Sequence, residues 1–206
     1  GMQNFHNWPL KADVPNYLFT PSGRVHSKLT QLAFKNLLHP FQPFVFGQRN
    51  MVVHIAKKFK IPLIFQGEPQ SERGGMEDEI GQYEMLPRYW TRTKNQKILM
   101  SGLELNELEK NHRITKNDIK FYLPMDEVEA QKEKIRIVYL GYFENLQPQE
   151  NYYLAAKLID FKPNDRRTEQ TYSKYNSIDD KIDPFHYYTA YIKFGYGRCT
   201  EESSME

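Results

Sequence analysis

Two carboxylates, Glu68 and Glu72, follow a short apolar run at residues 63–65, which predicts a strand that ends at Gly67. In open α/β sheets, ligands bind in the crevice beyond the carboxyl ends of the strands. Carboxylate oxygens suit Mg²⁺, a hard cation that usually works beside substrate phosphates. We therefore interpret Glu68 and Glu72 as candidate metal ligands at such a crevice. The alternative is that both are ordinary polar loop residues.

A second group alternates cationic side chains with tyrosines between residues 166 and 198. Arginine forks bind phosphate or carboxylate groups through paired hydrogen bonds, and tyrosine rings offer flat faces to bases or sugars. The group predicts a site for an anionic small molecule, with a solvated charged tail as the alternative. Its members are Arg166, Arg167, Thr168, Glu169, Lys174, Lys181, Lys193 and Arg198, interleaved with Tyr172, Tyr175, Tyr187 and Tyr191.

A histidine and two amides form a third group of candidates. Two prolines predict a non-helical loop over residues 39–44, because proline lacks a backbone donor and pushes the preceding residue into an extended conformation. This loop would present His39, Gln42 and, just beyond it, Gln48. The functional and the structural interpretation of His39 are equally open.

Other residues carry weaker functional signals. His54 lies inside a predicted helix at no metal-ligand spacing, and His186 lies in the first turn of another, so a packing role is the simpler interpretation of each. Nothing beside Cys199 in the sequence could act as its base. The chain has no HExxH, paired CxxC or GxSxG motif. Taken alone, the residues predict an α/β domain that binds an anionic small molecule.

The strands that would position these residues follow from hydrophobic patterning. Apolar runs at 63–65 and 135–140 predict two strands of a parallel sheet, and the first lacks alternation, as expected of a strand covered on both faces. A further short strand is predicted at 17–19. The segments 73–97 and 162–183 lack periodicity and predict long loops, the former a candidate lid.

Helices are predicted where apolar residues recur at three- and four-residue spacing. They span residues 27–38, 48–60, 103–111, 149–160 and 183–194. The expected core faces of two of them are Val52, Ile55, Ala56 and Phe59, and Leu154, Ala155, Leu158 and Ile159. The expected fold class is therefore α/β, a parallel sheet with helices and long C-terminal loops.

Composition narrows the class further. A length of 206 residues fits a single domain over 1–206, and 39% hydrophobic residues can supply a core. The net charge of +2 is too small to indicate that the protein binds nucleic acid. A single cysteine fits a reducing compartment, and no apolar stretch reaches the ~18–20 residues that span a bilayer. We expect a cytoplasmic protein that acts without a membrane.

Four long and unusual runs carry a resemblance. They are NFHNW (4–8), NLLHPFQPFVFGQRN (36–50), IAKKFKIPLIFQGEPQSE (55–72) and RTEQTYSKYNSIDDKIDPFHYYTAYIKFGYGR (167–198). With these runs the chain resembles the N-acetyl sugar amidotransferases of bacterial surface-polysaccharide and flagellin-sugar biosynthesis, over most of its length from Asn4 to Glu206.

The resemblance implies a PP-loop ATPase fold, of the adenine nucleotide alpha hydrolase type, and an ATP-dependent amidotransferase activity. Such enzymes are thought to convert a sugar N-acetyl group into an acetamidino group for lipopolysaccharide or flagellin glycan. ATP and Mg²⁺ would activate the amide oxygen by adenylation, and ammonia would displace AMP. The implied partners are the N-acetyl sugar, nucleotide-linked or free, a glutaminase subunit and a cyclase-like ammonia-channel subunit; a homo-oligomer is left open.

The resemblance also implies roles for individual residues. The strand-then-GxxxxE region of PP-loop enzymes faces the nucleotide and metal, so Gly67, Glu68 and Glu72 would bind there, with Glu68 also catalytic. Arg167 and Lys174 would contact phosphate. The other residues assigned on this basis are Glu169, as general base, and His39 as catalytic residues, and Gln42, Gln48, Thr168, Lys181, His186 and Arg198 as substrate- or nucleotide-binding residues.

One departure from the family is clear. Its phosphate-gripping SGGxDS loop and its zinc-like cysteine pairs have no match in this sequence. The chain therefore resembles the C-terminal half of such an enzyme, which would use ATP and Mg²⁺ only with the missing half supplied in cis or by another chain. The alternative is a truncated, non-catalytic domain that binds a sugar or a partner, so whether the chain is itself an enzyme stays open.

Overall fold

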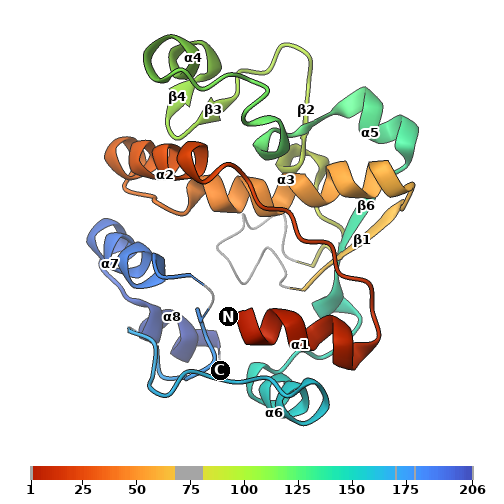
Figure 1. Cartoon of the computed structure of the whole chain (residues 1–206), viewed down its shortest axis with the longest axis vertical. Coiled ribbons are helices and arrows are strands. Elements are labelled where there is room, and N and C mark those ends of the chain that lie inside the picture. Colours follow the sequence, from red (N-terminus) through yellow and green to blue (C-terminus); the bar gives the residue numbers. More distant parts are fainter. Residues whose placement is uncertain (1, 68–80, 170, 179, 206) are drawn as a thin grey trace. The chain divides into compact units, whose positions relative to one another are not determined.

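The computed structural model describes residues 2–67, 81–169, 171–178 and 180–205 (Figure 1). It is a mixed α/β structure with small sheets, which confirms the coarse fold class expected from the sequence. Contacts divide the chain into two compact units, one combining Gly1–Thr20 with Leu146–Glu206 and the other formed by Pro21–Asn145. No helix within the described residues is both long and apolar enough to cross a membrane.

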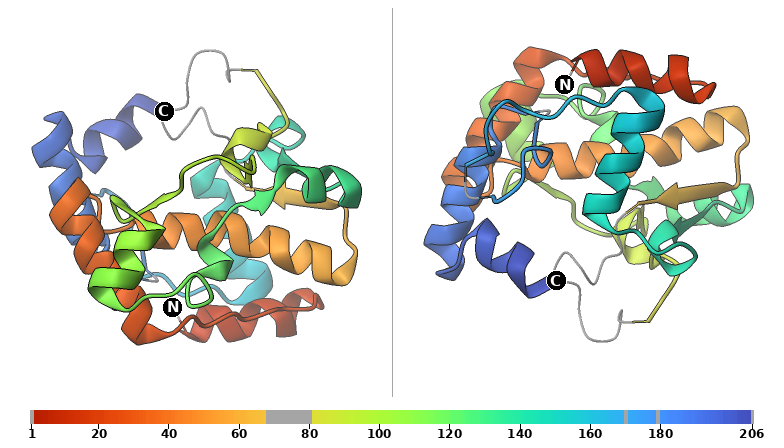
Figure 2. Two further views of the ribbon diagram at one scale, coloured as in Figure 1. Left: turned by 90° about the horizontal axis from the view of Figure 1, so that it is seen from above. Right: turned by 90° about the horizontal axis from the view of Figure 1, so that it is seen from below.

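The main sheet of the Pro21–Asn145 unit pairs β1 (Leu63–Gln66) with β6 (Arg136–Tyr139) in parallel (Figure 2). On the other edge of β6, the N–H of Met85 donates to the carbonyl oxygen of Ile137 at 2.8 Å. Strand β6 therefore has partners along both edges, and its last three residues are buried. The prediction of two parallel strands at these places is confirmed.

Strand β1 is more exposed than expected. Leu63 and Phe65 are 42% and 56% exposed, whereas Ile64 between them packs against the core. Among the described residues, β1 pairs only with β6, and helix α3 (Gln42–Phe59) contacts it. The prediction of a strand covered on both faces is therefore wrong, because an edge strand with one packed face alternates between buried and exposed positions.

Helix α3 begins earlier than predicted. Its first residue is Gln42, with Pro43 in the first turn, where a missing N–H costs no hydrogen bond. The predicted non-helical loop over residues 39–44 is therefore wrong for its second half. The helix ends at Phe59, and the capping residue Lys60 adopts a left-handed conformation with φ 55°.

The buried face of α3 also differs from the predicted apolar stripe. Its fully buried residues are Pro43, Asn50, Val53 and Ala56. Of the predicted stripe, Ala56 is buried, Val52 and Ile55 are half-buried, and Phe59 is 51% exposed. The prediction was wrong because hydrophobic periodicity considers only apolar residues and could not place Asn50 on the buried face. The side chain of Asn50 is buried there, and its amide donates to the carbonyl oxygen of Tyr122 at 2.8 Å.

Two further helices of this unit match their predictions. Helix α2 (Gly23–Leu37) lies beside α3 (Figure 1) and buries Val25, Leu29, Leu32 and Ala33. Helix α4 (Leu105–His112) starts with a capping box in which Glu104 and Glu107 bond each other's backbone N–H. One core cluster joins α2 to α4, with Leu29, Met100 and Leu108 at its centre, all fully buried.

Short elements complete the unit. They are η3 (Pro87–Tyr89), β2 (Thr91–Arg92), β3 (Leu99–Met100), β4 (Leu103–Glu104), η4 (Lys120–Tyr122), β5 (Met125–Asp126), α5 (Glu127–Glu133) and η5 (Leu140–Tyr142). Strands β2 and β5 pair in parallel, and β3 and β4 form an antiparallel hairpin. The part of 73–97 that the structure describes thus contains η3 and β2; its use as a lid stays a prediction.

The other unit is built from helices α1 (Met2–Ala12), α6 (Pro148–Ile159), α7 (Asp183–Phe194) and α8 (Arg198–Met205). Helices α6 and α7 match their predictions, and Gly195 ends α7 with φ 79°. Helices α1 and α8 were not predicted, and the predicted strand at residues 17–19 is absent. The expected core face of α6 is wrong in part, because Leu154 and Leu158 are 55% and 58% exposed.

Candidate functional site

The predicted site residues fall into both units. His39, Gln42, Gln48 and Gly67 belong to Pro21–Asn145, and the candidates from Arg167 to Arg198 belong to the other unit. Glu68 and Glu72 lie outside the described residues, so their assignment as metal ligands stays a prediction. Within the described residues, no group of three or more His, Cys, Asp or Glu side chains could hold a metal ion.

Gly67 lies at the carboxyl end of β1, as predicted, and is exposed. A Cβ built on it would meet no atom within 4 Å, so no described neighbour requires a glycine there. Because β1 and β6 are parallel, their carboxyl ends meet at one edge of the sheet. A ligand at this edge would approach Gly67 and the residues that follow β6.

Sequence reasoning missed an aromatic cluster at this edge. The rings of Phe65 and Tyr83 meet the ring of Phe143 edge-on, with centroids 6.4 Å and 6.1 Å away. The three rings, which we call the strand-end aromatic cluster, are 56%, 48% and 58% exposed. The sequence Gly141–Tyr142–Phe143, directly after the second predicted strand, was the signal that could have revealed it.

Gln42 has a structural partner. Its side-chain oxygen accepts a hydrogen bond from the N–H of Ser101 at 3.0 Å. The carbonyl oxygen of Ser101 accepts from Asn36 at 2.9 Å, and its hydroxyl donates to the carbonyl oxygen of Leu29 at 2.8 Å. Gln42 thus helps to hold the β3–β4 turn against α2 and α3, a role that sequence reasoning did not foresee.

The structure does not bring Gln42, His39 and Gln48 together as one loop. Gln42 and Gln48 are six residues apart on α3, so they point about 120° away from each other around the helix axis. Gln48 is exposed on this helix. His39 is half-buried between α2 and α3, where its carbonyl oxygen accepts from the N–H of Gln42 at 3.1 Å.

His54 has the packing role that the sequence favoured. Its Nε2 lies 3.1 Å from the carbonyl oxygen of Leu123, so this nitrogen carries the proton and donates. Its ring also meets Phe121 edge-on.

In the other unit, α1 and the end of α6 are clamped by two asparagines. The side chain of Asn4 donates to the carbonyl oxygen of Lys162 at 2.9 Å and accepts from its N–H at 2.8 Å. One turn further along α1, Asn7 donates to the carbonyl oxygen of Asp160 at 3.1 Å. The NFHNW run therefore has a structural role: it fixes the start of the loop that carries the cationic candidates.

Thr168 is the centre of that loop. It is buried, and its hydroxyl donates to the carbonyl oxygen of Asn176 at 2.8 Å and lies 3.4 Å from the side-chain nitrogen of Asn164. Thr171, also buried, donates its hydroxyl to the carbonyl oxygen of Thr168 at 2.9 Å. The hydroxyl of Thr168 is thus hydrogen-bonded inside the protein, and its contact with a ligand stays a prediction.

Two predicted cations flank this hydrogen-bonded centre. The N–H of Thr168 donates to the carbonyl oxygen of Ser173 at 3.4 Å, which brings the adjacent residues Arg167 and Lys174 close along the backbone. Both side chains are exposed. Glu169, the candidate general base, is also exposed and lies 3.7 Å from Arg166. The loop therefore has a hydrogen-bonded centre with exposed cations around it.

The remaining candidates lie on or near α7 and α8. Lys181 is exposed just before α7, and His186 is half-buried in its first turn, with its carbonyl oxygen accepting from Thr189 at 2.8 Å. The guanidinium of Arg198 lies over the ring of Tyr187, 5.4 Å from its centroid. The hydroxyl of Tyr187 is hydrogen-bonded to Ser177, which connects α7 to the loop.

Comparison with known proteins found no family model and no curated protein that match this chain.

Proposed function

We propose that this chain forms the substrate-facing part of an ATP-dependent amidotransferase that converts the N-acetyl group of a sugar into an acetamidino group. The proposal rests on the resemblance of residues 4–8, 36–50, 55–72 and 167–198 to that family. The structural observation that supports it best is the parallel pairing of β1 and β6, since β1 leads directly into Gly67 and the predicted ligands Glu68 and Glu72.

The chain's own residues would bind and orient the sugar. The exposed rings of the strand-end aromatic cluster suit the apolar face of a sugar or a base. Within the other unit, Arg167 and Lys174 are exposed beside the buried Thr168 and suit a phosphate group. ATP with Mg²⁺, if bound at Glu68 and Glu72, would supply the activation that an unreactive amide needs before ammonia replaces its oxygen.

The first test is calorimetric titration of the chain with ATP–Mg²⁺, AMP and nucleotide-linked N-acetyl sugars. The proposal expects a nucleotide-linked N-acetyl sugar to bind more tightly than the same nucleotide without the sugar. Sugar binding with no turnover after a P-loop-bearing chain is added would favour the alternative, a non-catalytic sugar-binding domain. Absence of any sugar binding, alone or with that chain, would contradict both.

The site assignment is tested by Arg167→Ala, measured in the assembled enzyme. Losing a charged hydrogen bond to phosphate should lower kcat/KM by about tenfold or more. The matched control is Lys157→Ala, which removes the same charge from an exposed position on α6 and should leave turnover unchanged. Equal activity of both variants would remove Arg167 from the site.

Glu68→Ala should abolish turnover without unfolding the protein.

A further inference from the structure

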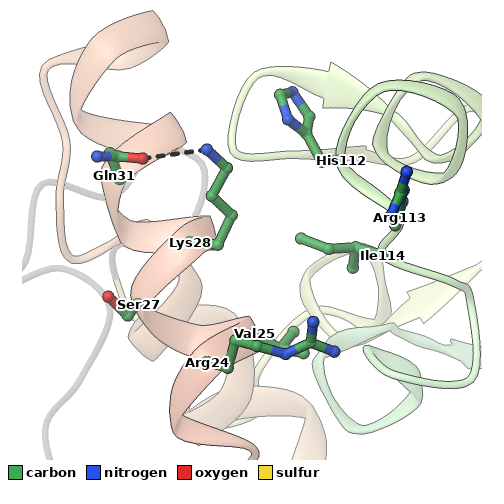
Figure 3. A pocket seen from close by; sticks show the side chains of 8 residues that line it. All are labelled: Arg24, Val25, Ser27, Lys28, Gln31, His112, Arg113 and Ile114. Carbon is green, nitrogen blue, oxygen red and sulfur yellow. Dashed lines mark hydrogen bonds between the residues drawn. The ribbon is translucent and has the colours of Figure 1, made fainter.

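A pocket lined mainly by cationic and polar side chains lies within the Pro21–Asn145 unit and contains none of the residues assigned above (Figure 3). Its volume is about 390 Å³. One wall is a face of α2, and the facing wall is the end of α4 with the residues after it (Figure 3). The lining residues are Arg24, Val25, Ser27, Lys28, Gln31, His112, Arg113 and Ile114.

The positive charges of this pocket are not balanced by its own lining. Arg24 and Lys28 come from α2 and Arg113 from the opposite wall, and no lining residue is acidic. Lys28 donates to the neutral side-chain oxygen of Gln31 at 3.1 Å. Among the described residues, neither Arg24 nor Arg113 forms an ion pair. Three like charges around one cavity repel each other, and a bound anion would relieve that repulsion.

Asp118 is an acidic group that interacts electrostatically with one lining residue, Arg24. Its carboxylate accepts hydrogen bonds from the hydroxyl and the N–H of Thr115, at 2.7 Å and 2.8 Å. These bonds, and to a smaller extent the charge of Arg24, lower the pKa of Asp118. The carboxylate is thus already bonded to Thr115, and Arg24 is the one lining residue whose charge is named among the causes of its lowered pKa.

Polar donors and an apolar wall complete the pocket. Arg24 and Val25 lie in the first turn of α2, where backbone N–H groups precede the first bond of the helix, from His26 to Ser22. Positive partial charge at this helix end adds to that of the side chains. Val25 and Ile114 form the apolar part of the lining; each is 4% exposed, so only a small apolar surface faces the rest of a ligand.

We propose that this pocket binds the phosphate of a small organic phosphate. Arginine forks from two sides match the geometry of phosphate oxygens, and Lys28 supplies a third charge. The apolar wall of Val25 and Ile114 then contacts the organic part. The cavity volume lies within the range of small-molecule sites. This site is independent of the proposed sugar site, and binding here does not require the amidotransferase assignment.

The test titrates the full chain with inorganic phosphate, pyrophosphate, a nucleoside diphosphate and succinate, and locates binding by backbone-amide NMR shifts. Phosphates should shift the amide resonances of residues 23–28 and 112–114. Succinate should bind at least about tenfold more weakly, because a carboxylate offers fewer acceptor oxygens to the arginine forks than a phosphate does. Tighter binding of the nucleoside diphosphate assigns an organic phosphate. Equal or tighter binding of pyrophosphate overturns the organic part of the proposal.

The decisive variant is Arg24→Gln with Arg113→Gln, which should weaken pyrophosphate binding by at least about tenfold. Its control, Lys94→Gln with Lys132→Gln, removes the same charge from exposed positions of the same unit and should change affinity less than about twofold. Lys28→Gln provides a second variant on the pocket wall if the double variant fails to fold. The proposal would be overturned if the pocket variants and the control lost pyrophosphate affinity equally, or if the amide shifts lay outside the pocket. Absence of phosphate binding at about 10 mM would also overturn it.

Discussion

Tyr122 shows how a single residue makes the stability of this fold depend on pH. Its side chain is 4% exposed, and its hydroxyl lies 2.9 Å from Nδ1 of His26. Burial raises the pKa of Tyr122 to about 12 from its usual 10.0. Because the unfolded chain ionises first, the stabilisation is complete below about pH 10 and is lost as the pH rises towards 12.

We therefore expect Tyr122 alone to lower the free energy of unfolding by about 2 to 3 kcal/mol between pH 10 and pH 12. Tyr122→Phe should remove this dependence on pH, so the free energy of unfolding of the variant should fall less steeply between pH 10 and pH 12. At neutral pH the variant should be about 1 kcal/mol less stable, because it lacks the hydrogen bond to His26. Urea unfolding at several pH values measures both slopes. The control is Tyr153→Phe, at a position 62% exposed, which should behave like the unchanged protein. Equal slopes of stability against pH for the unchanged protein and both variants would contradict the prediction.

Individual residues also show where sequence reasoning stops. Sequence reasoning assigned Gln42 and Thr168 as ligand-binding residues, and the structure shows that both also form hydrogen bonds inside the protein. Their partners could not be named in advance, because Gln42 bonds Ser101, which is 59 positions away and has no local signal. The choice between a structural and a ligand-binding role depends on such distant contacts.

At the scale of elements, the β3–β4 hairpin contains a turn that only glycine fits. Gly102 has φ 80°, and a Cβ on it would lie 2.9 Å from Cβ of Asn36. Gly102→Ala should therefore cost about 2 to 4 kcal/mol, from the backbone conformation and from the displacement of α2. The cost is measured as the change in the free energy of unfolding.

Gly81 separates the two causes. It has φ 88°, but a Cβ on it would meet no atom of the described residues within 4 Å. Gly81→Ala should therefore show the conformational cost alone, about 1 kcal/mol. If the two alanine variants are equally stable, the close approach of Asn36 carries no energy and the explanation for Gly102 fails.

The elements that sequence patterning predicted well are those held by apolar periodicity. Helix α2 and strand β6 each bury a regular set of apolar side chains. Helix α1 escaped prediction because its docking depends on Asn4 and Asn7, two polar residues one turn apart, and because it contains Pro9. Hydrophobic periodicity cannot detect a helix that is docked by hydrogen bonds of asparagine side chains.

At the scale of the whole molecule, the two units are stabilised differently. Among the described residues, every buried apolar side chain belongs to the Pro21–Asn145 unit. The buried residues of the other unit are polar: Thr168, Thr171, Ser173, Asp183 and Thr189. Because apolar burial is the main stabilising term in folding, local opening should cost less in the unit that contains α6 and α7.

Hydrogen exchange followed by mass spectrometry tests this difference. Backbone amides of α6 and α7 should exchange faster than those of α3 and β6, which border the buried core. Asn4→Ala should accelerate exchange at Lys162 further, because that N–H loses its acceptor. Equal protection of the two units would show that the polar unit is held as firmly as the apolar one.

The asparagine clamp has a consequence for synthesis on the ribosome. Asn4 and its partner Lys162 are separated by 158 positions, so the nascent chain must extend by that length before the clamp can close. At ordinary rates of translation, this takes roughly 8 to 30 s. Throughout that interval α1 carries Trp8 and Leu10, 50% and 82% exposed even in the folded protein, with no α6 to receive it. Helix α1 is thus synthesised well before the segment that holds it in place.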